Sequence, residues 1–161
     1  MKSIGDIVDL DVVPFGNGHE QGGKITCQHG PRECLANTLQ GCAQHIYPRQ
    51  TQWFAFILCM ERAPEPIAAV THCAKENGMD PQRLANCAKS EEGREILRTN
   101  ARRTLTLHPA NTHVPWITVN AQPLKDAENV VAAVCAQYQG ADKDKYCTEE
   151  TMRRFDPKAP H

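Results

Sequence analysis

The alternation of hydrophobic and polar positions near the start of the chain predicts a β-strand. Residues 7–13 alternate aspartates with Leu10 and Val12, and the run ends at Pro14. A period of two residues is typical of a strand that is buried on one side, and proline with the glycine-rich residues that follow it favours a loop. We therefore predict a strand over residues 7–13, followed by a loop.

The middle of the chain has no strand pattern and predicts a helical block. Helix-starting signals recur there, such as Asp80-Pro81, which supplies an N-cap residue and a proline at the first helical position. The continuous apolar run Trp53–Met60 suits a buried strand or a buried helix equally, and we interpret it as helix because its polar neighbours extend it. The predicted helices span about 32–43, 50–62, 64–76, 80–89 and 91–107.

The last third of the chain predicts a hairpin, one more helix and a tail. Residues 116–119 have strand chemistry, Asn120-Ala121 suits a tight turn, and a short second strand follows around residues 123–124. Asp126 can cap an amphipathic helix that ends at Gly140. Residues 148–161 are polar and contain proline, so we expect a loose tail there. The order strand, helices, hairpin and helix predicts an α+β fold.

Length, composition and charge narrow the class of protein. The 161 residues are 40% hydrophobic, enough for the core of one domain. Lys and Arg number 18 against 19 Asp and Glu, so the chain lacks the positive charge with which proteins bind nucleic acid or anionic membranes. The longest apolar run has eight residues, far below the roughly 20 of a membrane-spanning helix. We expect no nucleic-acid partner and no membrane span.

The chain contains eight cysteines, and their even number favours disulfides in an oxidising compartment. Buried free thiols are one alternative. Zinc is a weaker one, because structural zinc sites place cysteines two to four residues apart and the shortest gap here has six intervening residues. We therefore expect no metal and no cofactor. The N-terminus shows no signal peptide, which is simplest to explain if the sequence begins part-way through a longer precursor.

One segment resembles the signature of a known family. The residues from Cys27 to Cys42 resemble the pattern of the gamma-interferon-inducible lysosomal thiol reductase (GILT) family, and His113–Asn120 and Val12–Asn17 resemble two further segments of it. The resemblance extends over roughly residues 4–147. The matching signature residues are Cys27, Gln28, His29, Gly30, Glu33, Cys34, Asn37 and Cys42.

The resemblance implies a thioredoxin-like fold in residues 1–147, with a helical insertion at about 31–108 and a C-terminal tail at 148–161. It implies a thiol–disulfide oxidoreductase that reduces protein disulfides in an acidic endosomal or lysosomal compartment or in the secretory pathway. Pro115 matches a proline that is cis in this fold and leaves the backbone of Val114 free to pair with substrate. Val114, Pro115 and Trp116 are therefore the candidate substrate-binding residues.

The sequence also departs from the family pattern. Family members use a Cys-x-x-Cys pair located before the strand predicted here at residues 7–13, and no such pair occurs in these 161 residues. A reductase needs one thiolate to attack and a second thiol to resolve the mixed disulfide. We therefore identify no catalytic residue, and expect the first strand and the active-site helix to be missing or incomplete. The chain alone would then be a poor or inactive reductase.

Helix geometry limits how the signature cysteines can pair. If Gly30-Pro31 opens a continuous helix, Cys34 and Cys42 lie about 12 Å apart along it, beyond disulfide reach. Cys27 could reach one of the two, leaving the other for Cys59 or another partner. We favour structural bridges at these positions over catalytic thiols.

Two further pairings follow from the turns. The turn at residues 77–80 would fold the helix with Cys73 against the helix with Cys87, and a return of the chain at Gly140 would bring Cys147 toward Cys135. His72 beside Cys73 suggests a ligand pair, but adjacent helical residues point about 100° apart, and we interpret them as neighbours by chance.

Two alternative functions stay open. One is a non-enzymatic, disulfide-stapled domain that binds peptides, a pseudoenzyme of the family. The other is a zinc-binding helical module.

Overall fold

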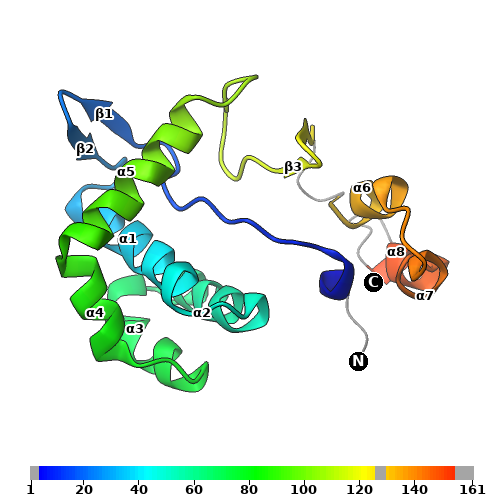
Figure 1. The fold of residues 1–161 in the computed structure, drawn as a ribbon, viewed down its shortest axis with the longest axis horizontal. Coiled ribbons are helices and arrows are strands. Elements are labelled where there is room, and N and C mark those ends of the chain that lie inside the picture. Colours follow the sequence, from blue (N-terminus) through cyan, green and yellow to red (C-terminus); the bar gives the residue numbers. More distant parts are fainter. Residues whose placement is uncertain (1–3, 126–129, 155–161) are drawn as a thin grey trace. The chain divides into compact units, whose positions relative to one another are not determined.

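The computed structural model describes residues 4–125 and 130–154. They fall into two compact units, one formed by Val12–Asn111 and the other by Met1–Asp11 together with Thr112–His161. The secondary structure of both units is drawn in Figure 1. The division predicted from the sequence, one domain over 1–147 with an insertion at about 31–108, stays a prediction.

The unit Val12–Asn111 is a small hairpin followed by helices (Figure 1). These helices confirm the predicted helical block, including the interpretation of Trp53–Met60 as helix. The elements are β1 (His19–Gln21), β2 (Lys24–Thr26), α1 (Pro31–Ile46), α2 (Gln50–Arg62), α3 (Pro66–Glu76), α4 (Pro81–Lys89) and α5 (Glu91–Leu105).

Local sequence signals fix where these helices begin. Proline lies in the first turn of α1, α3 and α4, where the missing N–H has no helical partner to lose. Asp80 caps α4, as predicted, by accepting a hydrogen bond from the backbone N–H of Gln82 at 2.9 Å. Ser90 caps α5 by accepting one from the backbone N–H of Gly93 at 3.3 Å.

The core of this unit surrounds α1, which packs against α2, α3, α4 and α5. Residues 38–43 of α1 are all buried. Phe56 and Met60 of α2 and Leu84 of α4 are fully buried. At Gly41 a Cβ atom would lie 2.5 Å from the side chain of Ile96, so glycine permits the close approach of α1 and α5. The helix α1 is therefore the central helix of this unit.

The second unit contains a hairpin and short helices among its described residues. The predicted hairpin is confirmed, with Asn120 and Ala121 at φ 48° and 64° in the turn. The predicted helix is confirmed in part, because Asp126 lies outside the described residues. The elements are η1 (Ile4–Ile7), β3 (Thr118–Val119), β4 (Gln122–Pro123), α6 (Val130–Gln137), α7 (Lys143–Tyr146) and α8 (Glu149–Arg154). Helices with small two-stranded sheets agree with the α+β prediction.

Two predictions about single segments are wrong. Residues 7–13 form no strand: η1 ends at Ile7, and the described ladders pair only β1 with β2 and β3 with β4. Alternation predicts which way side chains face, but a strand forms only where a second strand supplies the hydrogen-bond partners. Residues 149–154 of the expected loose tail form α8, because the Thr148 hydroxyl accepts a hydrogen bond from the backbone N–H of Thr151 at 3.1 Å.

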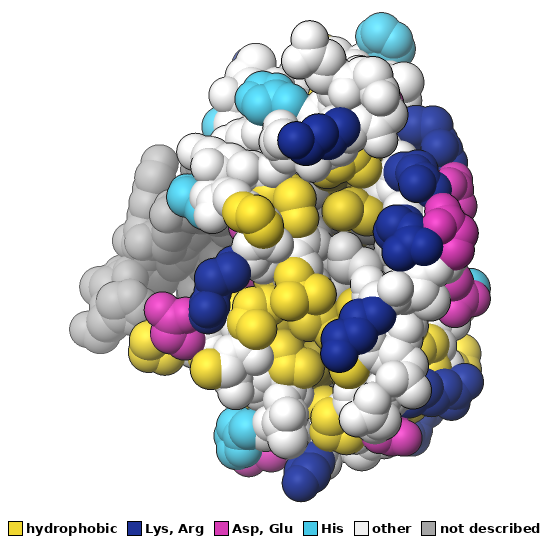
Figure 2. Space-filling model, turned by 90° about the vertical axis from the view of Figure 1, so that its left-hand side faces the viewer, with side chains coloured by type: hydrophobic (Ala, Val, Ile, Leu, Met, Phe, Trp, Pro, Cys, Tyr) yellow, Lys and Arg dark blue, Asp and Glu magenta, His cyan; other side chains and the backbone are white. Residues whose placement is uncertain are grey.

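The surface carries hydrophobic side chains and mixed charges. On the face drawn in Figure 2, hydrophobic side chains gather in the middle, with Lys and Arg side chains around them. The exposed large hydrophobic residues of the described ranges are Leu35, Leu105, Val114 and Met152. Within residues 4–125 and 130–154, no helix combines the length and the apolar character that crossing a membrane requires.

Candidate functional site

The signature segment forms a closed loop at the start of α1. Cys27 and Cys34 form a disulfide, with their Cα atoms 5.5 Å apart. Gly30 adopts φ 86°, its N–H donates to the carbonyl of Cys27 at 3.0 Å, and its carbonyl accepts from the N–H of Cys34 at 3.3 Å. Glycine tolerates this φ, and Pro31 then begins the helix. Of the two partners left open for Cys27 by the sequence, the structure selects Cys34.

The polar signature residues hold this loop in place. The Glu33 carboxylate accepts a hydrogen bond from the backbone N–H of His29 and lies 3.1 Å from Nδ1 of the same histidine. The amide of Asn37 donates to Sγ of Cys27 at 3.9 Å. Gln28 accepts a hydrogen bond from the side-chain amide of Asn17 at 2.9 Å. Each of these signature side chains thus has a local structural partner.

Only one of the two cysteines in the Cys27–Cys34 bridge is accessible to solvent. Cys27 is buried, whereas Cys34 is partly exposed in the first turn of α1. A thiolate released at a helix N-terminus would be stabilised by the helix dipole, and the adjacent Glu33 would oppose that effect. The pair could be reduced from outside, but as folded it contains no free thiol that could attack another disulfide.

Cys42, the last signature residue, lies apart from this loop. It is completely buried and bonded to Cys87 of α4, with the Cα atoms 6.1 Å apart. The predicted pair of Cys73 with Cys87 is wrong, because Cys73 is bonded to Cys59. The helices α3 and α4 do pack together. However, Cys73 faces α2 and Cys87 faces α1, so the turn between the helices does not bring the two sulfurs together.

The pairing of Cys135 with Cys147 is as predicted, with the Cα atoms 5.4 Å apart. It ties α6 to the residue that follows α7. All eight cysteines lie in the described ranges and all are disulfide-bonded, so this part of the chain contains no free cysteine.

The segment expected to bind substrate lies in the second unit. The Val114–Pro115 bond is cis, as predicted, and the His108–Pro109 bond is also cis, which the sequence did not predict. Val114 is 47% exposed, and the ring of Trp116 lies edge-on to that of His113 at 5.3 Å between centroids. The role of Val114, Pro115 and Trp116 in substrate binding stays a prediction.

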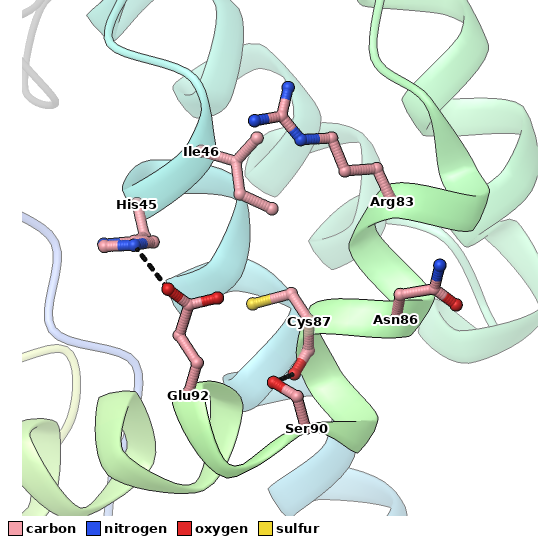
Figure 3. A pocket seen from close by; sticks show the side chains of 7 residues that line it. All are labelled: His45, Ile46, Arg83, Asn86, Cys87, Ser90 and Glu92. Atoms are coloured by element: carbon pink, nitrogen blue, oxygen red, sulfur yellow. Dashed lines mark hydrogen bonds and ion pairs between the residues drawn. The ribbon is translucent and has the colours of Figure 1, made fainter.

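A polar pocket of about 410 Å³ lies where α1 ends and α5 begins (Figure 3). Nε2 of His45 is 3.0 Å from a carboxylate oxygen of Glu92, and the Ser90 hydroxyl donates to the carbonyl of Cys87 at 2.7 Å. The sequence did not indicate this pocket, because its residues come from separate helices. They are His45, Ile46, Arg83, Asn86, Cys87, Ser90 and Glu92.

The clearest electrostatic network is on the exposed surface of α5. Hydrogen bonds from Arg98 and then Arg94 lower the pKa of Glu91, and those from Arg102 and then Arg98 lower the pKa of Glu95. Hydrogen bonds to both carboxylates raise the pKa of Arg98. All five charged groups of this network lie on α5, outside the signature segment at residues 27–42.

Comparison with known proteins gives consistent matches. The family model described as Gamma interferon inducible lysosomal thiol reductase (GILT) matches residues 1–77. The mouse protein named Gamma-interferon-inducible lysosomal thiol reductase is 32% identical over 149 residues, which are 89% of this chain and 60% of the mouse protein. The Arabidopsis thaliana Gamma-interferon-responsive lysosomal thiol protein is 33% identical, with 83% of this chain and 58% of that protein covered. Drosophila melanogaster GILT-like protein 1 is 33% identical, with 89% of this chain and 66% of that protein covered. The chain thus spans about three fifths of the length of these relatives.

Proposed function

Because the chain belongs to the gamma-interferon-inducible lysosomal thiol reductase family, we propose that it is part of a thiol–disulfide oxidoreductase that reduces disulfides of protein substrates. We further propose that its architecture is thioredoxin-like with a helical insertion, and that it works in an acidic endosomal or lysosomal compartment or in the secretory pathway. The names of the mouse and Arabidopsis relatives, both of which contain the words lysosomal and thiol, support the proposal.

One observation supports our proposal for what this chain contributes: all eight of its cysteines are in disulfides. Reduction of a substrate disulfide requires a thiolate that forms a mixed disulfide and a second thiol that releases it, leaving two substrate thiols and one enzyme disulfide. The described residues offer neither thiol. We therefore propose that a Cys-x-x-Cys pair outside these 161 residues performs the exchange, and that this chain supplies the scaffold and the substrate-binding surface.

The signature loop has a structural role in this proposal. The Cys27–Cys34 bridge and the contacts of Glu33 and Asn37 hold the turn that begins α1. The Cys42–Cys87 bridge then fixes α1 to α4. A scaffold that operates among thiols needs bridges that resist exchange, and complete burial of Cys42 provides this for the second bridge.

Substrate contact is proposed for the segment Val114-Pro115-Trp116. Val114 is exposed, so its backbone and side chain are accessible to an extended peptide. Trp116 adds an aromatic surface beside it. A peptide strand bound along this segment would present its disulfide to the catalytic dithiol.

A second candidate function is a peptide-binding domain without enzymatic activity. The observation in its favour is again the complete pairing of the cysteines, which suits a stapled binding module as well as a scaffold. The two candidates differ only in whether a dithiol acts together with this chain.

Reduction of an unfolded, disulfide-containing protein at acidic and at neutral pH tests the proposal. The assay compares the 161-residue chain, the chain extended by the N-terminal segment of the mouse relative, and the same extension with both Cys-x-x-Cys cysteines changed to serine. We expect activity only in the extended form with intact cysteines.

Two other outcomes contradict the proposal in different ways. No activity in any form, together with binding of the unfolded protein, would favour the peptide-binding domain. Activity of the 161-residue chain that is lost in Cys34→Ser or Cys42→Ser would mean that the signature cysteines are catalytic.

A further inference from the structure

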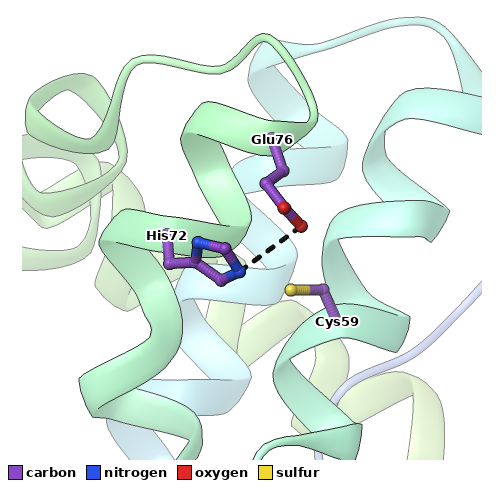
Figure 4. Close-up of side chains that lie close together, drawn as sticks. All are labelled: Cys59, His72 and Glu76. Carbon is purple, nitrogen blue, oxygen red and sulfur yellow. Dashed lines mark ion pairs between the residues drawn. The ribbon is translucent and has the colours of Figure 1, made fainter.

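Three potential metal ligands converge between α2 and α3, outside the signature loop (Figure 4). His72 and Glu76 lie four residues apart on α3, so they occupy the same helix face, with Nε2 and Oε2 3.4 Å apart. Sγ of Cys59 lies next to them on α2. One donor atom from each residue lies within 4.8 Å of the other two.

We propose that Cys59, His72 and Glu76 form a zinc site when a small-molecule thiol reduces the Cys59–Cys73 disulfide. In the disulfide the sulfur of Cys59 carries no negative charge and is a poor ligand. Reduction turns it into a thiolate, the form that binds metals. The site would therefore respond to the redox state of this bridge.

The donor set suits zinc in type and in charge. Thiolate sulfur, imidazole nitrogen and carboxylate oxygen are the three ligand types that zinc uses in proteins, at distances of about 2.0–2.3 Å. One thiolate and one carboxylate neutralise the two positive charges of the ion. Three protein ligands leave the fourth tetrahedral position for water. The helices α2 and α3 are already packed together, so we expect side-chain rotation to bring the donor atoms, now within 4.8 Å of one another, to the spacing of tetrahedral ligands.

The exposure of the two sulfur atoms decides which of them a reductant can attack in the Cys59–Cys73 disulfide. Cys73 is completely buried, Cys59 is partly exposed, and the side chains of His72 and Glu76 are 67% and 60% exposed. A thiolate of the reductant attacks Sγ of Cys59, forms a mixed disulfide there and expels the sulfur of Cys73, which takes up a proton. A second reductant thiol attacks the reductant sulfur of the mixed disulfide and releases Cys59. Two reductant thiols become one disulfide, and zinc binding releases the proton of Cys59.

The wide spacing of the cysteines along the chain predicted no metal site, and the helical geometry of the adjacent His72 and Cys73 indicated no ligand pair. The adjacent residues do point apart, but His72 faces the cysteine to which Cys73 is bonded. The packing of two helices, which local spacing does not encode, creates the arrangement.

The variant Cys73→Ser tests the site without reductant, because it leaves Cys59 as a free thiol and the other three bridges oxidised. Cobalt(II) is the probe, since a cobalt–thiolate bond gives a charge-transfer absorption band. We expect one cobalt ion per monomer with this band, its displacement by zinc, and no band in the oxidised wild-type chain. Adding His72→Ala or Glu76→Gln should weaken binding at least about tenfold, the loss typical even of residues that only support a ligand.

The matched control is Cys59→Ser, which removes the same disulfide and leaves Cys73 as the free thiol. We expect no band from it. Equal binding by Cys59→Ser and Cys73→Ser, or a Cys73→Ser variant that gives no band while its circular dichroism matches that of the wild type, would overturn the proposal. If both variants unfold, partial reduction of the wild type with added zinc decides: zinc should protect Cys59 from alkylation, and equal alkylation with and without zinc would refute the site.

Discussion

Replacement of Cys42 and Cys87 by alanine tests whether the stability of the helical unit, Val12–Asn111, depends on the bridge between α1 and α4. Both cysteines are buried, at 0% and 6% exposure, and they are 45 residues apart in sequence. A disulfide stabilises the folded state mainly by restricting the unfolded chain, and its effect grows with the length of the loop that it closes.

The separation sets the expected magnitude. A loop of 45 residues corresponds to about 4 kcal/mol. The Cys59–Cys73 bridge already shortens this loop by 14 residues, which lowers the estimate to about 3.7 kcal/mol. The Cys27–Cys34 bridge, with a separation of 7, corresponds to about 2.4 kcal/mol. We therefore expect the double variant at Cys42 and Cys87 to lose at least about 1.3 kcal/mol more than the matched variant at Cys27 and Cys34.

Urea unfolding followed by tryptophan fluorescence measures this difference. The chain has two tryptophans, one in each unit, and Trp53 is buried in α2 of the helical unit. A Trp116→Phe background makes Trp53 the sole reporter. Comparison of free energies of unfolding in this background isolates the unit that contains both bridges.

An equal or smaller loss at Cys42 and Cys87 than at Cys27 and Cys34 would refute the reasoning. It would mean that native contacts of the signature loop, rather than restriction of the unfolded chain, dominate the stability of the unit.

Three further outcomes are expected. Gly41→Ala should lower the free energy of unfolding by about 1–3 kcal/mol, because its methyl group meets the γ2 methyl group of Ile96, and a compensating Ile96→Ala, which removes that group, should recover part of the loss in urea unfolding. Ser90→Ala should lower the free energy of unfolding by about 1 kcal/mol through the lost helix cap, measured in the same way, whereas Ser90→Thr should keep most of the stabilisation by the cap. Because the pKa values of Glu91 and Glu95 in the folded state lie below the ordinary glutamate value of 4.5, their stabilisation is present above that pH and is lost as the pH falls through the lowered values. Replacing both by glutamine should flatten the pH dependence of the thermal midpoint below pH 4.5, and an unchanged slope would contradict this.

A functional site could be predicted from the sequence only where its residues form one continuous motif. The signature from Cys27 to Cys42 is long enough to identify a family by itself, and the comparisons agree with it. The metal-ligand cluster of Cys59, His72 and Glu76 has no such signal, because its residues belong to two helices. The polar pocket at the end of α1 escaped prediction for the same reason.

The sequence by itself determined the elements whose causes are local. The helices of the middle block begin at prolines and caps such as Asp80, and the hairpin turns at Asn120-Ala121, because these residues act on their own backbone. The cap at Thr148 was equally local and was overlooked. The pairing of Cys135 with Cys147 was predictable because only a short connection separates them.

Tertiary structure alone decided which helix faces meet. Cys73 of α3 faces α2 and bonds to Cys59. Cys87 of α4 faces α1 and bonds to Cys42. Residues 7–13 have the side-chain pattern of a strand but no place in the described ladders. Side-chain direction depends on the packing of a whole helix, and strand formation depends on a partner elsewhere in the chain. Local spacing encodes neither, so both followed only from the folded molecule.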